Sequence, residues 1–242
     1  MLSNISKKAL IGENVQIGDF VKIYDNVVIA DNVTIQDHCI IGLPNDNATG
    51  PLTIGEGSII RSHTIVYEGS TLEKGVKTGH SCLIRENNQI GRGVQLGSFA
   101  ELEGYIKIGN WSRVHSKVQL SRRVEIGKFC YLFPRVQTSD DPLPPSHVAL
   151  PPKIGDLSVI AINSLILSGV NIGRGCFIGA NTVVKDDVKD LECVMGSPAK
   201  KVCKINQLRD LKNKIRHPWH NHFRDGFPEE AQGELDAEIA KI

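Results

Sequence analysis

Histidines are the side chains of this chain best suited to acid–base chemistry. An imidazole titrates close to neutral pH, so it can take a proton from a nucleophile and later return it. His80 and His115 lie in the long middle part of the sequence, with His38 and His63 before them. The elements that position these histidines decide which of them can share one site.

Those elements follow a six-residue repeat. An aliphatic residue returns at nearly every sixth position through three uninterrupted blocks, 11–46, 54–143 and 154–189. An α-helix has a period of 3.6 residues and an ordinary strand a period of two, whereas a solenoid with one short strand on each face keeps a six-residue period. Three repeats make one coil of a triangular prism, so the blocks predict an all-β, parallel β-helix of about nine coils.

The corners of the predicted prism have their own residue pattern. Glycine often follows the aliphatic residue, where we expect a tight corner with a positive φ. Small or β-branched residues come four positions after the aliphatic residue and are expected to point inward. Four cysteines, Cys39, Cys82, Cys130 and Cys176, take this place, which predicts small core residues. Cys193 and Cys203 lie beyond the repeat without a CxxC spacing, so no metal site is indicated.

The composition narrows the class of protein. The chain has 242 residues, of which 40% are hydrophobic and only 5% aromatic, and its net charge is +1. This charge balance gives no case for a nucleic-acid partner. No apolar run approaches the ~18–20 residues of a membrane span, and residues 1–4 lack a signal sequence, so we expect no membrane insertion and a cytoplasmic protein.

Two loops and a C-terminal extension interrupt or follow the repeat. We expect a β-helix domain over 1–202, loop insertions at 45–53 and at the Pro-rich 139–153, and a helical extension over 203–242. Within the extension, 206–216 and 229–242 are predicted helices. The segment between them contains His217, His220 and His222. Its proline and tryptophan favour packing of a helix on the prism over metal binding.

The register of the repeat relates His115 to the last coils. Val114, Leu132 and Ile160 belong to one column of the prism, because each is one coil from the next once the second loop is removed. His115 is therefore predicted to lie two coils, roughly 10 Å, from Ala161 along the same edge. His80 belongs to the same column, about two coils further away.

Several motifs carry a family resemblance. The repeat, the segment IGDLSVIAINSLILSGVNIGRGCFIGANTVVKDDV and the exit VMGSPAKKV resemble the hexapeptide-repeat acyltransferases, which are left-handed β-helix enzymes. The block TGHSCLIRENNQIG and the later EGYIKIG and VHS are most similar to N-acetyltransferases of nucleotide-linked amino sugars in surface-polysaccharide (O-antigen or capsule) synthesis. The resemblance implies a left-handed parallel β-helix, acetyl-coenzyme A as co-substrate, and a homotrimer with its active sites between neighbouring prisms.

The resemblance also implies the residues that hold the cofactor. In related enzymes the pantetheine arm lies along the last coils, against backbone groups of small residues. Ala161, Gly179 and Ala180 match those positions. Lys185, Lys200 and Lys201 stand where the cofactor phosphates would lie, although lysines at the end of a solenoid also suit a solvated face.

The catalytic residues are assigned by combining register and resemblance. His115 is expected to be the general base, because a pantetheine arm at Ala161 can bring its thioester there. His80 resembles the histidine of a Gly-His motif that is the base in some members; here its distance from the expected cofactor end favours binding of the sugar or nucleotide, with direct chemistry as the alternative. Asp141 stands where sugar O-acetyltransferases of the maltose and galactoside type carry a catalytic histidine in Thr-x-x-His-Pro. This difference favours N-acetylation over O-acetylation, with Asp141 free to orient the amine or the histidine.

Two other functions are compatible with a trimeric β-helix. A γ-type carbonic anhydrase uses the same prism and three zinc-binding histidines, but no closely spaced histidine pair occurs within the predicted prism. A trimeric scaffold without catalysis needs no coenzyme A site. Binding of coenzyme A discriminates the scaffold from an enzyme.

Overall fold

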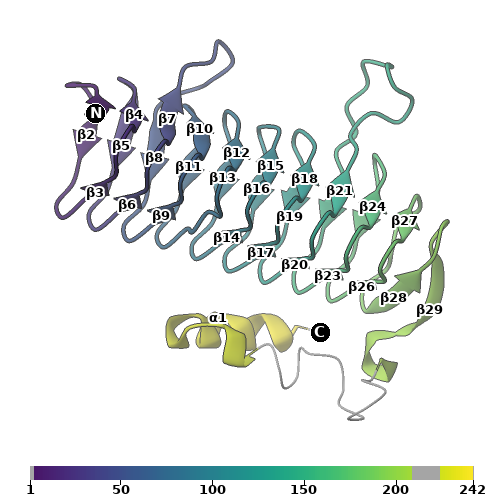
Figure 1. Ribbon diagram of the computed structural model, residues 1–242. Coiled ribbons are helices and arrows are strands. Elements are labelled where there is room, and N and C mark those ends of the chain that lie inside the picture. The colour runs from purple at the N-terminus through teal and green to yellow at the C-terminus, as the bar shows by residue number, and fades with distance from the viewer. Residues whose placement is uncertain (1–2, 209–223, 242) are drawn as a thin grey trace.

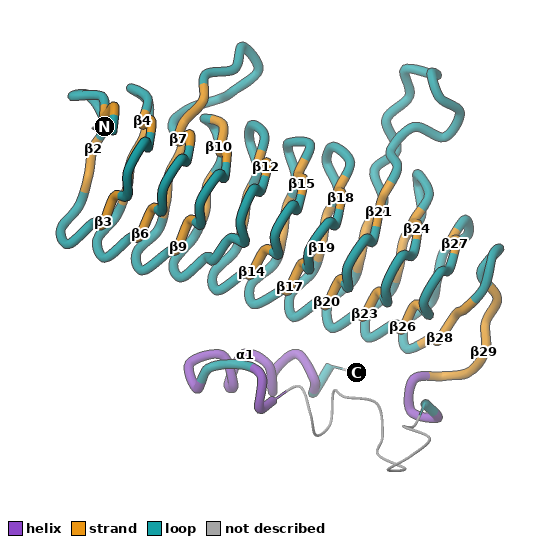
Figure 2. Tube along the Cα trace, in the orientation of Figure 1, coloured by secondary structure: helices purple, strands orange, loops and turns teal. Residues whose placement is uncertain are grey.

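The computed structural model describes residues 3–208 and 224–241 and shows a parallel β-helix (Figure 1). Successive coils lie side by side, and each coil places short strands on the faces of a prism. Most strands are only two residues long, as Figure 2 shows by the short orange segments between long teal turns. The predicted all-β solenoid is therefore confirmed.

The strands form three faces, called A, B and C in the order in which the chain visits them. Face A is a ten-stranded sheet of β1 (Asn4–Ile5), β4 (Lys22–Ile23), β7 (Ile40–Leu43), β10 (Ile65–Tyr67), β12 (Leu83–Ile84), β15 (Glu101–Leu102), β18 (Gln119–Leu120), β21 (Gln137–Thr138), β24 (Leu165–Ile166) and β27 (Val183–Val184). Face B is a nine-stranded sheet of β2 (Leu10–Ile11), β5 (Val27–Ile29), β8 (Leu52–Ile54), β11 (Thr71–Leu72), β13 (Gln89–Ile90), β16 (Lys107–Ile108), β19 (Glu125–Ile126), β22 (Lys153–Ile154) and β25 (Asn171–Ile172). Face C consists of β3 (Gln16–Ile17), β6 (Thr34–Ile35) and β9 (Ile59–Ile60), then β14 (Gln95–Leu96), β17 (Arg113–Val114), β20 (Tyr131–Leu132), β23 (Val159–Ile160), β26 (Phe177–Ile178), β28 (Glu192–Met195) and β29 (Lys200–Lys204). Lys77 bridges the two parts of face C by pairing with Ile59 and Gln95.

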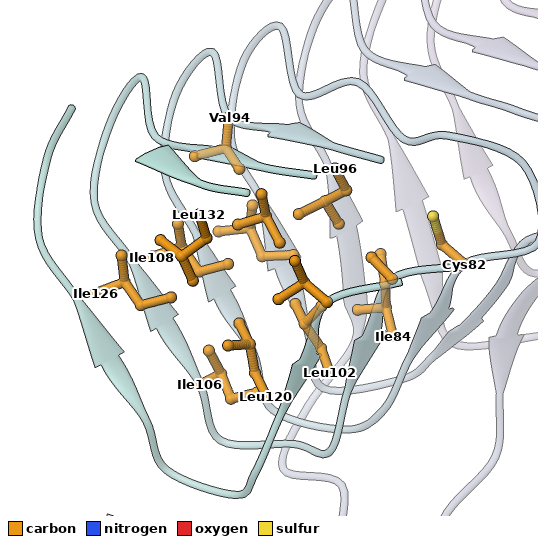
Figure 3. Close-up of a cluster of buried hydrophobic side chains, with 14 of the residues drawn as sticks. Cys82, Ile84, Val94, Leu96, Leu102, Ile106, Ile108, Leu120, Ile126 and Leu132 are labelled. Carbon is orange, nitrogen blue, oxygen red and sulfur yellow. The ribbon is translucent and has the colours of Figure 1, made fainter. Parts of the chain in front are cut away.

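The core consists of the repeating aliphatic residues. Parallel pairing joins each coil to the next in the expected register, as with Leu96, Val114 and Leu132 on face C. Figure 3 shows the side chains of Leu96 and Leu132 directed into the prism together with Cys82. The cysteines predicted in the core are buried and free, and burial raises the pKa of Cys130 to about 12.

The corners differ from the prediction in one respect. Most of the glycines that follow the aliphatic residue do not have a positive φ, although Gly42 does (φ 75°); at the other corners the positive φ occurs two positions later, as at Ser81 and Phe99. The glycine is needed because the next coil passes very close. A Cβ on Gly79 would lie 2.1 Å from the backbone nitrogen of Ser98, and one on Gly97 would lie 2.2 Å from that of Ser116.

Both ends of the solenoid extend beyond the predicted blocks. The first strand, β1, lies one repeat before residue 11 and pairs with β4. The last coil continues past residue 189, because β28 continues face C in parallel with β26. Strand β29 then turns back and pairs with β28 in the antiparallel direction, which closes the exposed edge. This hairpin has no six-residue pattern and was not predicted.

Both insertions leave the prism between faces A and B, at what we call the AB corner (Figure 1). The first connects β7 to β8, and the second connects β21 to β22. Lys153 belongs to β22, so the second loop is one residue shorter than expected. The division into domains at residue 202 stays a prediction.

The C-terminal extension lies alongside the prism. Helix α1 (Glu229–Ile239) confirms the second predicted helix, and Phe227, Ala231 and Leu235 form one buried cluster with Trp111 and Phe129 of the prism. The short 3₁₀ helices η1 (Ile205–Gln207) and η3 (Arg224–Gly226) are also described. Most of the other predicted helix, 206–216, lies outside the described residues, as do His217, His220 and His222.

Polar contacts also hold α1 to the prism. Glu234 accepts a hydrogen bond from Trp111 Nε1 at 3.0 Å. It forms ion pairs with Lys128 at 2.9 Å and Arg92 at 3.1 Å. No helix within 3–208 or 224–241 is long and apolar enough to cross a bilayer, and in these ranges no cluster of three His, Cys, Asp or Glu residues could hold a metal ion.

Candidate active site

The corner at which the chain passes from face C to face A, which we call the CA corner, holds both candidate histidines. His115 directly follows β17, and Ala161 directly follows β23. The pairing of Val114 with Leu132 and of Leu132 with Ile160 confirms that they are two coils apart on this corner. His80 is about two coils away in the other direction, since Lys77 pairs with Gln95 and Gln95 with Arg113.

His115 is held by aromatic neighbours from the following coil. Its Nε2 lies 2.9 Å from the hydroxyl oxygen of Tyr131. Its ring stacks on Phe133 with centroids 5.5 Å apart and an angle of 13°. The backbone N–H of His115 donates to the carbonyl of Leu132 at 2.8 Å. Tyr131 and Phe133 thus hold the imidazole in place. The other ring nitrogen, Nδ1, takes part in none of these contacts.

The surroundings of His115 favour its neutral form. Burial, together with the positive charge of Arg113, lowers the pKa of His115 below its ordinary value. Arg113 is itself anchored, because its guanidinium donates to the carbonyl of Gly226 and lies 4.7 Å from the ring centroid of Phe227. The C-terminal extension therefore fixes a charge that keeps His115 able to accept a proton.

A small pocket of about 180 Å³ opens at this place. It is lined by Gln95, Leu96, Gly97, Arg113, Val114, His115 and Tyr131. Gly97 occupies the place of His115 one coil earlier, so no side chain fills the space beside the imidazole. This pocket can admit a small group to the histidine.

His80 has a different environment. It is exposed, and its Nδ1 lies 2.7 Å from the hydroxyl oxygen of Ser62. Its backbone N–H donates to the Ser98 hydroxyl at 3.1 Å. These contacts orient the ring toward the preceding coil. Within one chain, His80 and His115 do not form a joint site.

Asp141 lies in the second loop at the AB corner, away from the CA corner of the same chain. Its carboxylate accepts hydrogen bonds from the backbone N–H groups of Leu143, at 2.9 Å, and Ser146, at 2.8 Å. The Ser146 hydroxyl donates to it as well, and these bonds lower the pKa of Asp141. Asp141 thus shapes the loop, and only a second copy of the chain can bring it to His115.

The predicted cofactor residues fall into two groups. Ala161, Gly179 and Ala180 share the CA corner beyond His115, and Lys200 and Lys201 lie on β29 at the end of face C. Lys201 is paired with Glu192 at 2.6 Å. Lys185 lies at the AB corner and contacts Asp186 at 3.2 Å, so the structure does not place it with the others.

Tyr131, Phe133 and Arg113 were missed by the sequence analysis. The repeat contained a signal that could have predicted them. The two residues that flank a buried aliphatic residue point outward, and in a parallel β-helix they lie beside the flanking residues of the next coil. Tyr131 and Phe133 flank Leu132, and Arg113 pairs in register with Tyr131. The contact of Arg113 with Gly226 had no such signal, since the extension does not follow the repeat.

Comparison with known proteins identifies the repeat. Residues 8–42 and 151–186 match the family model of the bacterial transferase hexapeptide (six repeats). A stretch of 72 residues is 38% identical to 2,3,4,5-tetrahydropyridine-2,6-dicarboxylate N-acetyltransferase of Staphylococcus aureus (strain JH9), covering 30% of this chain. The chain spans only 29% of the length of that relative. The resemblance to hexapeptide-repeat transferases is thereby confirmed for the repeat itself.

Solved structures share the fold. LpxA, a UDP-N-acetylglucosamine acyltransferase from Bacteroides fragilis 9343, aligns with a TM-score of 0.54 at 22% identity, covering 97% of this chain and 80% of that one. A UDP-N-acetylglucosamine acyltransferase of Arabidopsis aligns with a TM-score of 0.50 at 15% identity, covering 84% and 72%. At these identities the likeness shows a common β-helix.

Proposed function

We propose that this protein transfers the acetyl group of acetyl-coenzyme A to the amine of a nucleotide-linked amino sugar, in surface-polysaccharide synthesis. The observation that carries the proposal is the state of His115. This imidazole is held by Tyr131 and Phe133 beside an open pocket, and burial lowers its pKa. A neutral, positioned histidine is the group that an amine needs to lose its proton.

The CA corner beyond His115 suits the acetyl donor. A pantetheine arm needs a narrow surface on which it can reach backbone groups, and Ala161, Gly179 and Ala180 offer small side chains there. Ala180 is exposed, and Ala161 is partly exposed. Lys200 on neighbouring β29 is exposed and has no ion pair among the described residues, so it is available to a phosphate. These residues fit coenzyme A.

The reaction needs one proton transfer and one acyl transfer. The lone pair of the sugar nitrogen attacks the thioester carbon, the new carbon–nitrogen bond forms, and the carbon–sulfur bond breaks. His115 takes the proton that the nitrogen loses and returns it to the sulfur, which leaves as the free thiol. Tyr131 holds the imidazole in place during this exchange through the 2.9 Å contact with Nε2.

A homotrimer is part of the proposal. The second loop exposes apolar side chains, with Leu143 77% exposed and Val148 and Leu150 nearly half exposed. The CA corner exposes Phe133 and Ile162 near His115. The two apolar surfaces lie on different corners, so they can meet only between copies of the chain, as in a ring of three prisms.

The acceptor class rests on the sequence blocks around His80 and His115 and on the fold. The two solved structures named above belong to enzymes of a nucleotide-linked sugar. An amine is favoured over a hydroxyl because Asp141 replaces the histidine expected in sugar O-acetyltransferases. We place the reaction in the cytoplasm, where acetyl-coenzyme A is available.

The test is a panel of nucleotide-linked amino sugars, each incubated with acetyl-coenzyme A and the purified protein. Release of free thiol reports transfer, and mass spectrometry of the sugar shows an N-acetyl product. Matched hydroxyl sugars, which lack the amine, serve as the control. Calorimetry measures whether coenzyme A binds, and absence of binding contradicts the proposal. If coenzyme A binds but acetyl groups are transferred only to the hydroxyl sugars, the protein is an O-acetyltransferase and the proposed N-acetylation is wrong.

A further inference from the structure

A column of residues with left-handed backbone runs along the CA corner. These corner residues come three positions after the buried aliphatic residue of face C, and their φ angles lie between 53° and 63°. In order along the prism they are Phe20, His38, His63, Ser81, Phe99, Lys117, Arg135, Asn163 and Asn181. Because the backbone is the same at each position, the side chains leave the corner in the same direction.

The first members of this column form a stack of flat rings. Phe20 and His38 lie 4.8 Å apart with an angle of 3°, and His38 and His63 lie 4.8 Å apart with an angle of 4°. The next position is Ser81, which has no ring, and the following one is Phe99. Phe99 is 58% exposed and has no ring contact within the described residues.

The spacing defines the size of the gap. Consecutive coils are separated by about 4.8 Å, and the observed ring separations equal this spacing. His63 and Phe99 are two coils apart, so about 9.6 Å separates their places in the column. A flat ring placed outside Ser81, on the level of its coil, would therefore lie about 4.8 Å from the ring of His63 and about 4.8 Å from that of Phe99. The existing rings have the same stacking distance.

We infer that the space above Ser81, between His63 and Phe99, is a slot for the nucleobase of the acceptor substrate. The inference rests on the proposed function, because it names the place where a nucleotide-linked sugar is held. A nucleobase is planar and stacks on aromatic rings, and such stacking accepts different bases. His80 lies next to the slot, held by Ser62.

The rest of the acceptor fits the same corner. Lys117 continues the column beyond Phe99 on the coil of His115, is exposed, and has no ion pair among the described residues. It can contact the phosphates of a nucleotide. His115 lies two coils, about 10 Å, beyond the slot. The acceptor thus approaches His115 from the N-terminal coils, and coenzyme A approaches it from the C-terminal coils.

The test fills the slot without changing the fold. Ser81→Phe places a ring in the gap, and the same left-handed backbone already carries phenylalanine at Phe20 and Phe99. Ser81→Ala is the matched control, because it leaves the gap open. The probes are uridine 5′-diphosphate and guanosine 5′-diphosphate, with ribose 5-phosphate as a probe without a base, and binding is measured by calorimetry.

We expect Ser81→Phe to weaken binding of at least one nucleoside diphosphate by about tenfold or more, the size of a lost base–aromatic stack. Ser81→Ala should bind it like the wild type, and coenzyme A should bind equally to all three proteins. Unchanged nucleotide affinity in Ser81→Phe would overturn the inference. So would equal affinity of the wild type for ribose 5-phosphate and the nucleotides.

Light scattering of Ser81→Phe distinguishes the other possible occupant. If this variant loses its wild-type oligomeric state, the slot holds a side chain from a second copy, and the inference is wrong. The slot and the proposed function can fail separately. If the wild type binds coenzyme A and transfers acetyl groups, but Ser81→Phe does not change the KM of the sugar, the proposed function stands and the slot is refuted.

Discussion

His115→Ala should slow acetyl transfer much more than it weakens coenzyme A binding. The substitution removes the only imidazole among the residues that line the pocket of about 180 Å³. Loss of a general base costs about 10²–10⁴-fold in rate, which corresponds to roughly 3–5 kcal/mol of barrier. Ala161, where we place the pantetheine arm, lies two coils away, so the affinity for coenzyme A should change little.

The assay compares kcat by thiol release with coenzyme A affinity by calorimetry. His38→Ala is the matched control for kcat, because it removes an exposed imidazole from the same corner, four coils from His115. Tyr131→Phe keeps the ring but removes the hydroxyl that contacts Nε2, so we expect a smaller loss in kcat than for His115→Ala. His80→Ala should raise the KM of the sugar with less effect on kcat.

The pH profile gives an independent check of the same reasoning. Burial and Arg113 lower the pKa of His115, so the folded protein resists its protonation. The wild-type rate should therefore hold down to about pH 6.5, the ordinary pKa of histidine, and fall only below it. A fall that begins clearly above pH 6.5, or a His115→Ala variant with a kcat near that of the wild type, would refute the role of His115 as base.

Two further substitutions test the donor site and the extension. Ala161→Trp should abolish coenzyme A binding in calorimetry by filling the corner, while circular dichroism stays unchanged; unaltered affinity would refute the placement of the pantetheine arm. Glu234→Ala should lower the free energy of unfolding by about 1–3 kcal/mol, because it leaves Lys128 and Trp111 without their shared acceptor. Denaturation of both proteins measures this loss, and equal stability would show that the contacts of Glu234 contribute nothing net.

The repeat predicted the solenoid and the register of its faces because one physical constraint acts in every coil. Each coil must direct an aliphatic residue inward, so the pairing of Val114 with Leu132, and of Leu132 with Ile160, could be derived from spacing alone. The place of His115 relative to Ala161 followed from the same constraint. A period of six does not reveal which corner residue takes a positive φ, and for this reason the prediction of a positive φ was wrong at most of these glycines, although it holds at Gly42.

Contacts outside the repeat could not be derived in this way. The carbonyl of Gly226 reaches Arg113 across more than a hundred residues of sequence, and no pattern relates the two. Strand β29 pairs with β28 through backbone groups, which leave little trace in residue type. The environment that sets the protonation of His115 therefore had to come from the structure, although the histidine itself was predicted.

Mixed assemblies offer a decisive test of the site between copies. His115 lies at the CA corner and the loop of Asp141 at the AB corner, so the two halves that a single chain carries belong to two different sites. His115→Ala removes the base from the half at the CA corner. Asp141→Ala removes the acceptor that holds Leu143 and Ser146 in the half at the AB corner. Each variant alone should form trimers with little activity, with about three times the 26.5 kDa chain mass in light scattering.

In trimers reassembled from equal amounts of both variants, a junction with two intact halves arises in about one case in four, because each junction draws its halves from two different chains. We therefore expect mixing to restore about a quarter of the wild-type rate. If both halves of the site came from one chain, mixing would add nothing to the activity of the separate variants.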